Sequence, residues 1–224
     1  MKRSEINASI DRARKFFAKK GFPLPPYADW TPQQWKEAGP EHDEIRILGL
    51  GWDVTDFGSG DLARVGRTIF TLRNGARQDP RFPKQYAQKA MHMEEGQKSV
   101  IHYHRSKMED ICNQGGGNIL IELWRAGADD ELSQQSFEVS VSGIRRSVKG
   151  GDVVRLEPGA SICLIPRTYH RFWAEEGHGA VLSVEVSSVC DDKTDNFFYE
   201  SGERFPGIHE DEERRYVLCG EYFS

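Results

Sequence analysis

The chain has 224 residues, of which 38% are hydrophobic and 11% aromatic, so it is long and apolar enough to bury one sizeable core. Charged residues make up 29% of the chain and are mixed in sign, a composition that excludes fibrous classes and argues against disorder. The net charge of −5 leaves no excess of basic residues, which nucleic-acid or anionic-membrane partners require. No apolar run approaches the ~20 residues that span a bilayer, and the first residues lack the apolar core of a signal peptide, so we expect a cytoplasmic protein.

The N-terminal part predicts two helices. Ile6, Ile10, Ala13 and Phe17 recur at steps of four, three and four, which places them along one side of a helix ending near Gly21. A second, short helix is expected from Thr31, because Thr as N-cap, proline at the next position and glutamine three residues on resemble a capping box. It should end by residues 39–40.

From residue 44 the apolar period changes to two, which indicates strands. The expected strands are residues 44–50, 67–75, 99–104, 118–124, 136–143, 151–159, 161–166 and 180–186, each closed by turn-forming residues. Strands this numerous and short predict an antiparallel sandwich or barrel, with the N-terminal helices covering an open face or an edge. We therefore expect one domain over residues 1–224, with a helical extension at 1–43 and a β-barrel core at 44–224.

The remaining segments carry weaker signals. The tail at residues 209–223 predicts a solvated, charged turn followed by a strand-like stretch. The four cysteines, Cys112, Cys163, Cys190 and Cys219, are at least 27 positions apart without a CxxC pair, so we expect reduced thiols and no zinc knuckle.

Histidine spacing supplies the main chemical signal. On a strand, residues two apart project to the same face, so His102 and His104 share one side while Tyr103 points to the other. Glu109 follows a short bend from which the next strand can carry its carboxylate back, and His170 follows the apolar strand at 161–166. Three imidazoles and one carboxylate suit a divalent ion such as Mn, Fe, Co or Zn and leave one or two positions open for substrate oxygens. We interpret the other histidines, His42, His92, His178 and His209, as loop or surface residues.

These residues resemble the cupin superfamily. The pattern Gly96-x5-His102-x-His104-x4-Glu109-x6-Gly116 is similar to its first motif in full. Residues 159–170 resemble its second motif in a degenerate form, with Thr168 where a glycine is usual and His170 four residues after the proline instead of five.

A more specific resemblance is to the bacterial D-lyxose isomerase family, and it runs over nearly the whole chain. The strings that carry it include WDVTDFGSG, YAQKAMHMEEGQ, EDICNQGGGNILIELW, SICLIPRTYHRFW and VEVSSVCDDKTDNFF. The resemblance implies an all-β, cupin-type β-barrel (jelly roll) with N-terminal helices packed on it, and a homodimer. It also implies Mn²⁺, or Co²⁺ or another divalent ion, held by His102, His104, Glu109 and His170. The implied activity interconverts D-lyxose and D-xylulose, and in many members also D-mannose and D-fructose.

This reaction needs a base beside the metal ligands. Aldose–ketose isomerisation through a cis-enediolate removes a carbon-bound proton next to a carbonyl and returns it to the neighbouring carbon. Glu109 would be committed to the ion, so the candidates are Glu185, Asp191, Asp192 and Glu203, which spacing alone does not rank. Lys107 is a candidate for a different catalytic role, because its ammonium could reach a substrate oxygen. The competing interpretation is a surface lysine.

Two other interpretations stay open at this point. The same four ligand types occur in Fe(II)-dependent cupin dioxygenases, and a non-catalytic sugar-binding cupin would also retain them. Trp124, Tyr169 and Trp173 could stack on a sugar, although we expect such aromatics to be core residues. The sequence does not rank D-lyxose against D-mannose, because that choice depends on pocket depth.

Overall fold

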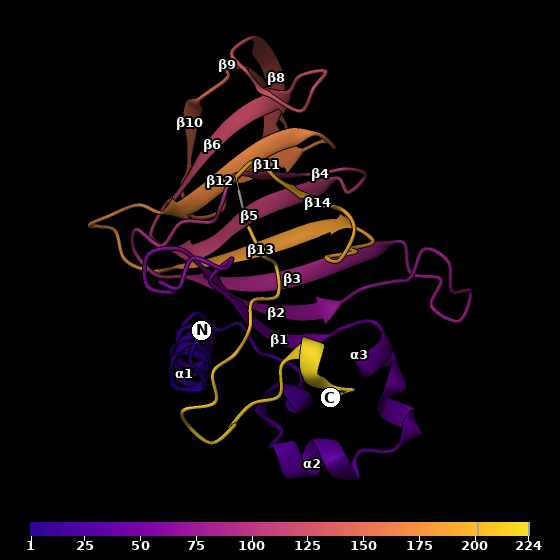
Figure 1. The fold of residues 1–224 in the computed structure, drawn as a ribbon. Coiled ribbons are helices and arrows are strands. Elements are labelled where there is room, and N and C mark those ends of the chain that lie inside the picture. Colours follow the sequence, from indigo (N-terminus) through magenta and orange to yellow (C-terminus); the bar gives the residue numbers. More distant parts are fainter. Residues whose placement is uncertain (201, 224) are drawn as a thin grey trace.

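The strands form two curled antiparallel sheets, and the helices gather below one end of the larger sheet (Figure 1). The computed structural model describes residues 1–200 and 202–223. The helices are α1 (Arg3–Lys19), η1 (Pro26–Asp29), α2 (Pro32–Glu37), η2 (Pro40–His42), α3 (Asp43–Ile47) and η3 (Cys219–Glu221). The strands are β1 (Gly51–Thr55), β2 (Arg67–Arg73), β3 (Tyr86–Met93), β4 (His102–His104), β5 (Glu109–Gly116), β6 (Ile119–Ala126), β7 (Leu132–Ser133), β8 (Ser136–Val141), β9 (Ile144–Lys149), β10 (Asp152–Leu156), β11 (Ser161–Leu164), β12 (Thr168–Ala174), β13 (Val181–Ser188) and β14 (Asn196–Phe198).

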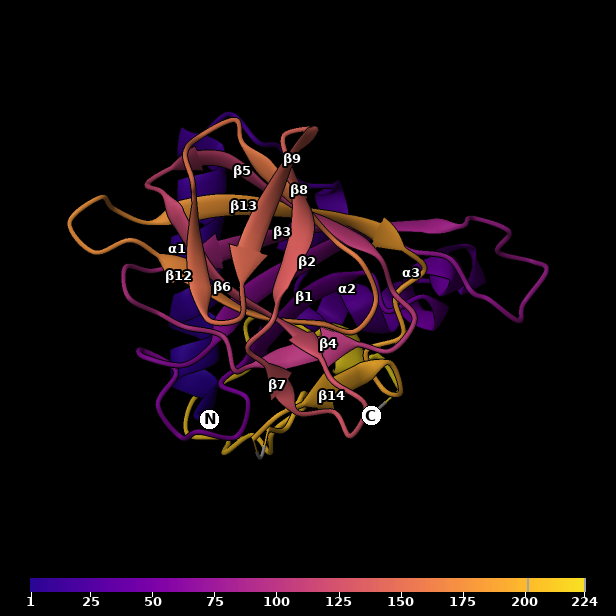
Figure 2. The ribbon, with the colours of Figure 1, turned by 90° about the horizontal axis from the view of Figure 1, so that it is seen from above.

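The order of strands places residues from distant parts of the chain side by side. The larger sheet runs β1-β2-β3-β13-β5-β11-β8-β9, and the smaller runs β10-β6-β12-β4-β14 with β7 paired to β6. In the view from above, β4 and β14 lie next to one another, as their register requires (Figure 2). The expected all-β, cupin-type barrel with N-terminal helices is confirmed.

The barrel core follows from the period-two pattern. On β6 the residues Ile119, Ile121 and Leu123 are fully buried, whereas Leu120 and Glu122 between them are only partly covered. These inward residues meet those of β5, β11 and β13 from the other sheet in one apolar cluster. Sheet alternation thus places the apolar set between the sheets, and polar residues at one end of that space are free to form a site.

Both predicted N-terminal helices are present. Ile6, Ile10, Ala13 and Phe17 of α1 are buried against the outer side of β1 and β2, where they share a cluster with Trp52 and Phe70 among others. The turn after α1 uses Gly21 at φ +66°, a conformation that favours glycine. Helix α2 has the predicted capping box, in which the amide of Gln34 donates to Thr31 Oγ1 and the amide of Thr31 donates to Gln34 Oε1.

The strand predicted at residues 44–50 is wrong. Residues 43–47 form α3, and the first strand begins at Gly51. The alternation of Ile45 and Ile47 does not reflect a buried face, since Ile47 is 43% exposed. The guanidinium of Arg46 instead donates to the carbonyl oxygens of Gly39 and Ala38, which stabilises a compact helical turn against the preceding segment.

The C-terminal tail also differs from its prediction. Residues 210–218 form no strand; a single bridge joins Leu218 to Trp52, and a short 3-10 helix follows. The acidic residues contact α1 rather than solvent alone. Arg3 donates to both oxygens of Glu210 at 2.8 and 2.7 Å and to Glu221 at 2.5 Å, and Asn7 donates to Glu212 at 2.9 Å. The tail therefore fastens the first helix to the barrel.

Two further observations complete the fold. All four cysteines are unpaired. Among residues 1–200 and 202–223, no helix combines the length and the apolar composition that crossing a membrane requires.

Arg3→Met should destabilise the protein by about 2 kcal/mol at neutral pH, because it removes the buried cation that Glu210 and Glu221 both contact. The hydrogen bond from Arg3 lowers the pKa of Glu210 below its ordinary value of 4.5. A carboxyl whose pKa is lowered on folding stabilises the protein above its unfolded pKa and loses that contribution as the pH falls through the folded value. The stability gap between wild type and variant should therefore narrow below about pH 4.5 in urea unfolding curves.

Arg12→Met is the matched control, since Arg12 pairs with Glu94 on the surface and both side chains are more than a third exposed. Its effect should stay within about 1 kcal/mol. A gap between wild type and Arg3→Met that stays constant with pH would contradict the role given to the tail carboxylates.

Candidate active site

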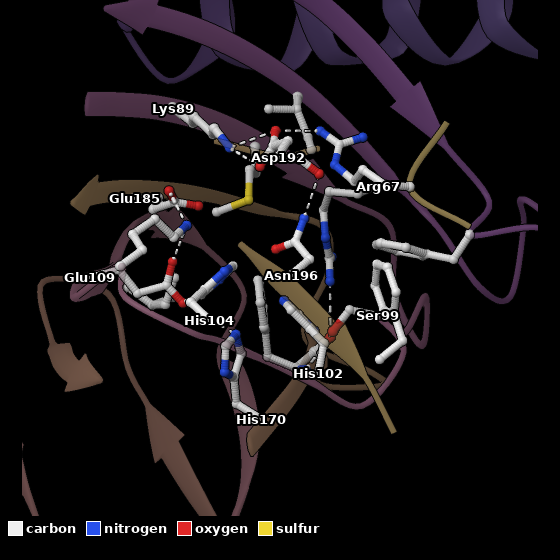
Figure 3. Close-up of a pocket in the computed structure, with 18 residues that line it drawn as sticks. Arg67, Lys89, Ser99, His102, His104, Glu109, His170, Glu185, Asp192 and Asn196 are labelled. Carbon is white, nitrogen blue, oxygen red and sulfur yellow. Dashed lines mark hydrogen bonds and ion pairs between the residues drawn. The ribbon is translucent and has the colours of Figure 1, made fainter. Parts of the chain in front are cut away.

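A polar pocket opens at the end of the space between the sheets. Its walls come from both sheets, from the loop after β1, and from the segment around β14 (Figure 3). The lining residues are Phe57, Arg67, Ile69, Lys89, Met91, Ser99, His102, His104, Lys107, Glu109, Ile111, His170, Phe172, Glu185, Asp192, Asn196, Phe198 and Arg204. Charged side chains are thus concentrated in an enclosed place, which singles this pocket out as the candidate site.

Three histidines meet on the smaller sheet. Strand β4 presents His102 and His104 on one face, as the spacing predicts, and β12 pairs with β4 so that His170 lies opposite His102. One ring nitrogen from each of the three lies within 4.8 Å of the others, a group able to hold a metal ion. Tyr103 points away into an aromatic cluster with Trp124 and Tyr169. The three predicted imidazoles therefore converge through strand pairing.

Backbone carbonyls orient two of these rings. His102 Nδ1 is 2.9 Å from the carbonyl oxygen of Val100, and His170 Nδ1 is 3.1 Å from that of Thr168. A carbonyl can only accept, so Nδ1 carries the proton and the Nε2 lone pair of each neutral ring is free to bind a metal. Burial and the neighbouring imidazoles hold the pKa of His102 well below its usual range, which keeps that ring neutral.

Glu109 approaches the histidines from the larger sheet. Its side chain is 2% exposed, and Oε1 lies 3.2 Å from His170 Nε2 and 3.4 Å from His104 Nε2. Within the described part of the chain, this buried oxygen accepts no hydrogen bond. A buried carboxylate oxygen needs a partner, and a cation between it and the imidazole nitrogens would supply one. The three histidine nitrogens and this oxygen together form a donor set that suits a divalent ion.

Lys107 joins Glu109 to a second buried carboxylate. Its ammonium lies 2.6 Å from Glu109 Oε2 and 2.7 Å from Glu185 Oε1, and all three side chains are at most 8% exposed. Burial opposes the charged form, but the two carboxylates raise the pKa of Lys107 above its ordinary value, so it remains an ammonium. The same charge overcomes burial to hold the pKa of Glu109 well below its usual range.

A second charged group closes another side of the pocket. Asp192 lies 3.0 Å from the ammonium of Lys89 and 3.0 Å from the guanidinium of Arg204, which also pairs with Asp53 of β1 at 2.5 Å. Burial alone would raise the pKa of Asp192, but the positive charges of Lys89 and Arg204 hold this pKa well below its usual range. Asp192 is therefore an ionised carboxylate committed to two cations.

The structure separates the remaining sequence candidates. Glu185 and Lys107 lie in the pocket next to Glu109, whereas Asp191 is exposed and caps the turn at residues 191–194. Glu203 is exposed and lines a neighbouring surface pocket rather than the one that holds the histidines. Trp124 and Tyr169 belong to the aromatic cluster behind β4, in agreement with their interpretation as core residues.

Two histidine segments differ from their sequence-based expectations. His92 is not a surface residue: it is 3% exposed and packs against Phe16 and Phe17, because β3 presents it to α1. The degenerate second motif still delivers His170, since Arg167 takes the positive φ of +61° that a glycine would accommodate. The backbone amide of Arg167 donates to the carbonyl oxygen of His104 at 2.9 Å, and this hydrogen bond connects the turn to β4.

Sequence reasoning missed several pocket residues. Arg67, Lys89, Ser99 and Asn196, together with three phenylalanines, line the pocket at positions to which the sequence analysis gave no role. Lys89 carried a weak signal, since it stands in the same two-residue series as Ala87, Met91 and Met93 and so shares their strand face. The others become pocket residues only through strand order.

The sequence is similar to known sugar isomerases over nearly its whole length. The family model described as D-lyxose isomerase matches residues 1–222. The D-lyxose/D-mannose isomerase of Escherichia coli O157:H7 is 45% identical over 223 residues, covering 99% of this chain and 98% of that protein. The protein of the same name from Serratia proteamaculans is 44% identical over 223 residues, with the same coverage.

Solved structures with a similar fold are more distant in sequence. The L-ribose isomerase of Cellulomonas parahominis with L-psicose superposes with a TM-score of 0.61 at 15% identity, covering 93% of this chain and 98% of that chain. The L-ribose isomerase of Geodermatophilus obscurus has a TM-score of 0.56 at 14% identity, with the same coverage of both chains. At these identities the likeness concerns the fold.

The four-donor cluster should bind about one equivalent of a divalent ion per chain. Glu109→Ala and His170→Ala should each weaken binding by at least about tenfold, because each removes one of four donors. Manganese retained after dialysis, measured by atomic emission, checks this.

His178→Ala is the control, because His178 is an exposed residue near Glu175 and outside the cluster. It should retain the ion as wild type does. Full retention by both Glu109→Ala and His170→Ala would refute the assignment of the metal ligands.

Proposed function

Because this chain belongs to the D-lyxose isomerase family, we propose that it interconverts D-lyxose with D-xylulose and D-mannose with D-fructose in the pocket of His102, His104, Glu109 and His170. The family establishes a sugar isomerase of the aldose–ketose type. The observation that carries the assignment to this pocket is that three clustered histidines and the adjoining Glu109 lie beside a separate buried carboxylate, Glu185, which Lys107 holds. Isomerisation needs both of these components.

The first component is a place for a divalent ion. His102, His104, His170 and Glu109 would hold it; when bound, such an ion polarises a carbonyl and stabilises negative charge developing on neighbouring oxygens. The unsatisfied Glu109 oxygen and the oriented histidines support this proposal. Manganese, like the homodimer and the cytoplasmic location, stays a prediction.

The second component is a base that transfers the proton. Glu185 lines the pocket but does not belong to the four-donor set. Among residues 1–200 and 202–223, hydrogen bonds engage its Oε1 alone, from Lys107 at 2.7 Å and Ser187 at 3.2 Å. We infer that its carboxylate takes the proton from the carbon next to the carbonyl and returns it to the neighbouring carbon, through a cis-enediolate. Asp192 is less suited because two cations already engage it, and Glu203 because it is exposed.

Lys107 positions this base. Two of its three N–H donors are used by Glu109 and Glu185, and the third can donate to a substrate oxygen. Because it bridges the metal ligand and the base, it holds them at a set separation. It also adds positive charge close to the oxygens that become negative during the reaction.

The surroundings favour an isomerase over a dioxygenase. The walls facing the histidines carry Lys89, Lys107, Glu185 and Asp192, which suit a polyhydroxylated substrate better than a small apolar one. The rings of Phe57 and Phe198, whose centres are 6.3 Å apart, also line the pocket and would limit the water it holds. Partial exclusion of water strengthens the electrostatic interactions inside.

Removal of the metal should abolish turnover. Chelator-treated protein should form no D-xylulose from D-lyxose and no D-fructose from D-mannose, and adding back Mn²⁺ or Co²⁺ should restore both activities, because the ion stabilises the developing charge. The measurement is ketose formed with Mn, Co, Mg, Zn and Fe in turn. Sugar binding without ketose formation for any metal would favour a non-catalytic sugar-binding protein instead.

Glu185→Gln should lower kcat by about 10²- to 10⁴-fold with little change in bound manganese, because it removes the proton acceptor while leaving the four donors. Glu203→Gln is the comparison variant and should change kcat by less than about threefold, given its exposed position. Steady-state kinetics on D-lyxose and metal content should be measured on the same preparations. A large loss in Glu203→Gln with normal kcat in Glu185→Gln would transfer the role of base to the exposed carboxylate.

A further inference from the structure

Arg67 occupies the wall of the pocket on the side of β2. Its side chain is among the most deeply buried in the protein, at 2% exposure. The guanidinium lies 4.4 Å from the centre of the Phe172 ring, and Nη2 donates to the carbonyl oxygen of Phe172 at 3.0 Å. These contacts hold the guanidinium in one orientation beside Asn196 and Ser99 (Figure 3).

The other terminal nitrogen of Arg67 is unsatisfied. Nη1 is buried and has no hydrogen-bond partner among residues 1–200 and 202–223. The other cations that line the pocket, Lys89, Lys107 and Arg204, each pair with carboxylates, whereas no described carboxylate lies within 4.0 Å of Arg67. A buried charged donor without an acceptor is costly, so its retention in a pocket wall indicates a ligand atom as its partner.

Strand order tells which part of a substrate this donor can reach. Glu109 lies on β5 and Arg67 on β2, with β13 and β3 between them. Three strand spacings of about 4.8 Å separate these backbones, and both side chains point into the same pocket. Phe172 lies between Arg67 and His170, its ring centre 6.2 Å from that of His170. A sugar whose reacting end lies at the histidines therefore extends its other end toward Arg67.

We propose that Arg67 Nη1 donates a hydrogen bond to a hydroxyl at C4 or C5 of the open-chain sugar and thereby determines substrate specificity at the end remote from the metal ligands. The inference rests on the proposed function for the placement of the reacting end. A charged donor in a buried wall rejects a substrate that lacks the matching hydroxyl, since Nη1 then stays unpaired. Arg67 takes no part in proton transfer.

The test compares D-lyxose with 4-deoxy-D-lyxose and 5-deoxy-D-lyxose in wild type and Arg67→Met. Wild type should prefer D-lyxose over one of the two analogues by about 10- to 100-fold in kcat/KM, the range expected for a charged hydrogen bond. In Arg67→Met this preference should fall to nearly one, with most of the loss on D-lyxose. The ratio between substrates does not depend on how much of the preparation is folded.

Two further variants keep the result interpretable. Arg67→Lys keeps the positive charge but loses the planar guanidinium, so the preference of this variant for D-lyxose over the analogue should fall at least about threefold. It replaces Arg67→Met in the test if that variant does not accumulate as folded protein. Arg155→Met removes a half-exposed arginine that pairs with Glu157 and Glu175 and should leave the preference unchanged. Equal losses on all three sugars in the Arg67 variants would overturn the proposal, because they would indicate a structural role only.

A binding measurement separates this proposal from the proposed function. D-arabinitol, the alditol of D-lyxose, and its two deoxy analogues are titrated calorimetrically into wild type and Arg67→Met. Wild type should bind D-arabinitol about tenfold or more tightly than one analogue, and Arg67→Met should bind both alike. If no metal supports turnover, the proposed isomerisation fails while this result still decides the role of Arg67; unchanged discrimination in the variant refutes that role.

Discussion

The arrangement of the site depends on the ion pair that Lys107 forms with two buried carboxylates. Glu109 and Glu185 lie on neighbouring strands and are almost completely shielded from water, where two carboxylates side by side would repel one another. The ammonium between them, 2.6 and 2.7 Å away, makes this arrangement stable. One carboxylate can then face the histidines while the other stays available beside them, so ligand and base are kept separate although they are close.

The same need to pair buried charge extends across the pocket wall. Lys89 lies directly opposite Glu185 in the sheet and pairs with Asp192, which pairs with Arg204, which in turn pairs with Asp53 on β1. This chain of contacts ties the segment after β14 to the first strand and closes the pocket. Arg67 differs from the other lysines and arginines that line the pocket, because no described carboxylate pairs with it. Its unpaired donor therefore indicates where a substrate atom binds.

The helices and tail contribute by supporting the sheet edge rather than the chemistry. Helix α1 covers the outer side of β1 and β2, and the acidic tail holds α1 through Arg3 and Asn7. The tail also forms a bridge with the edge strand β1, between Leu218 and Trp52, and β2, which carries Arg67 on its inner side, is paired with β1 and β3. The family model matches residues 1–222 and therefore includes both the helices and the barrel.

The sequence by itself determined the local features. Helical period, capping residues and two-residue alternation predicted α1, α2 and half of the strands in the described part of the chain. The HxH spacing placed His102 and His104 on one face, because residues two apart on a strand project to the same side. The strand-like stretches predicted at residues 44–50 and in the tail are not strands, because Arg46 and Arg3 form contacts there that local alternation does not reveal. Only the tertiary structure decided that Glu185, and not Asp191, Asp192 or Glu203, adjoins the four donors, and that Arg67 faces them across the pocket. The reason is physical: contacts between strands far apart in the chain follow from sheet order and register, and no spacing within one segment encodes them.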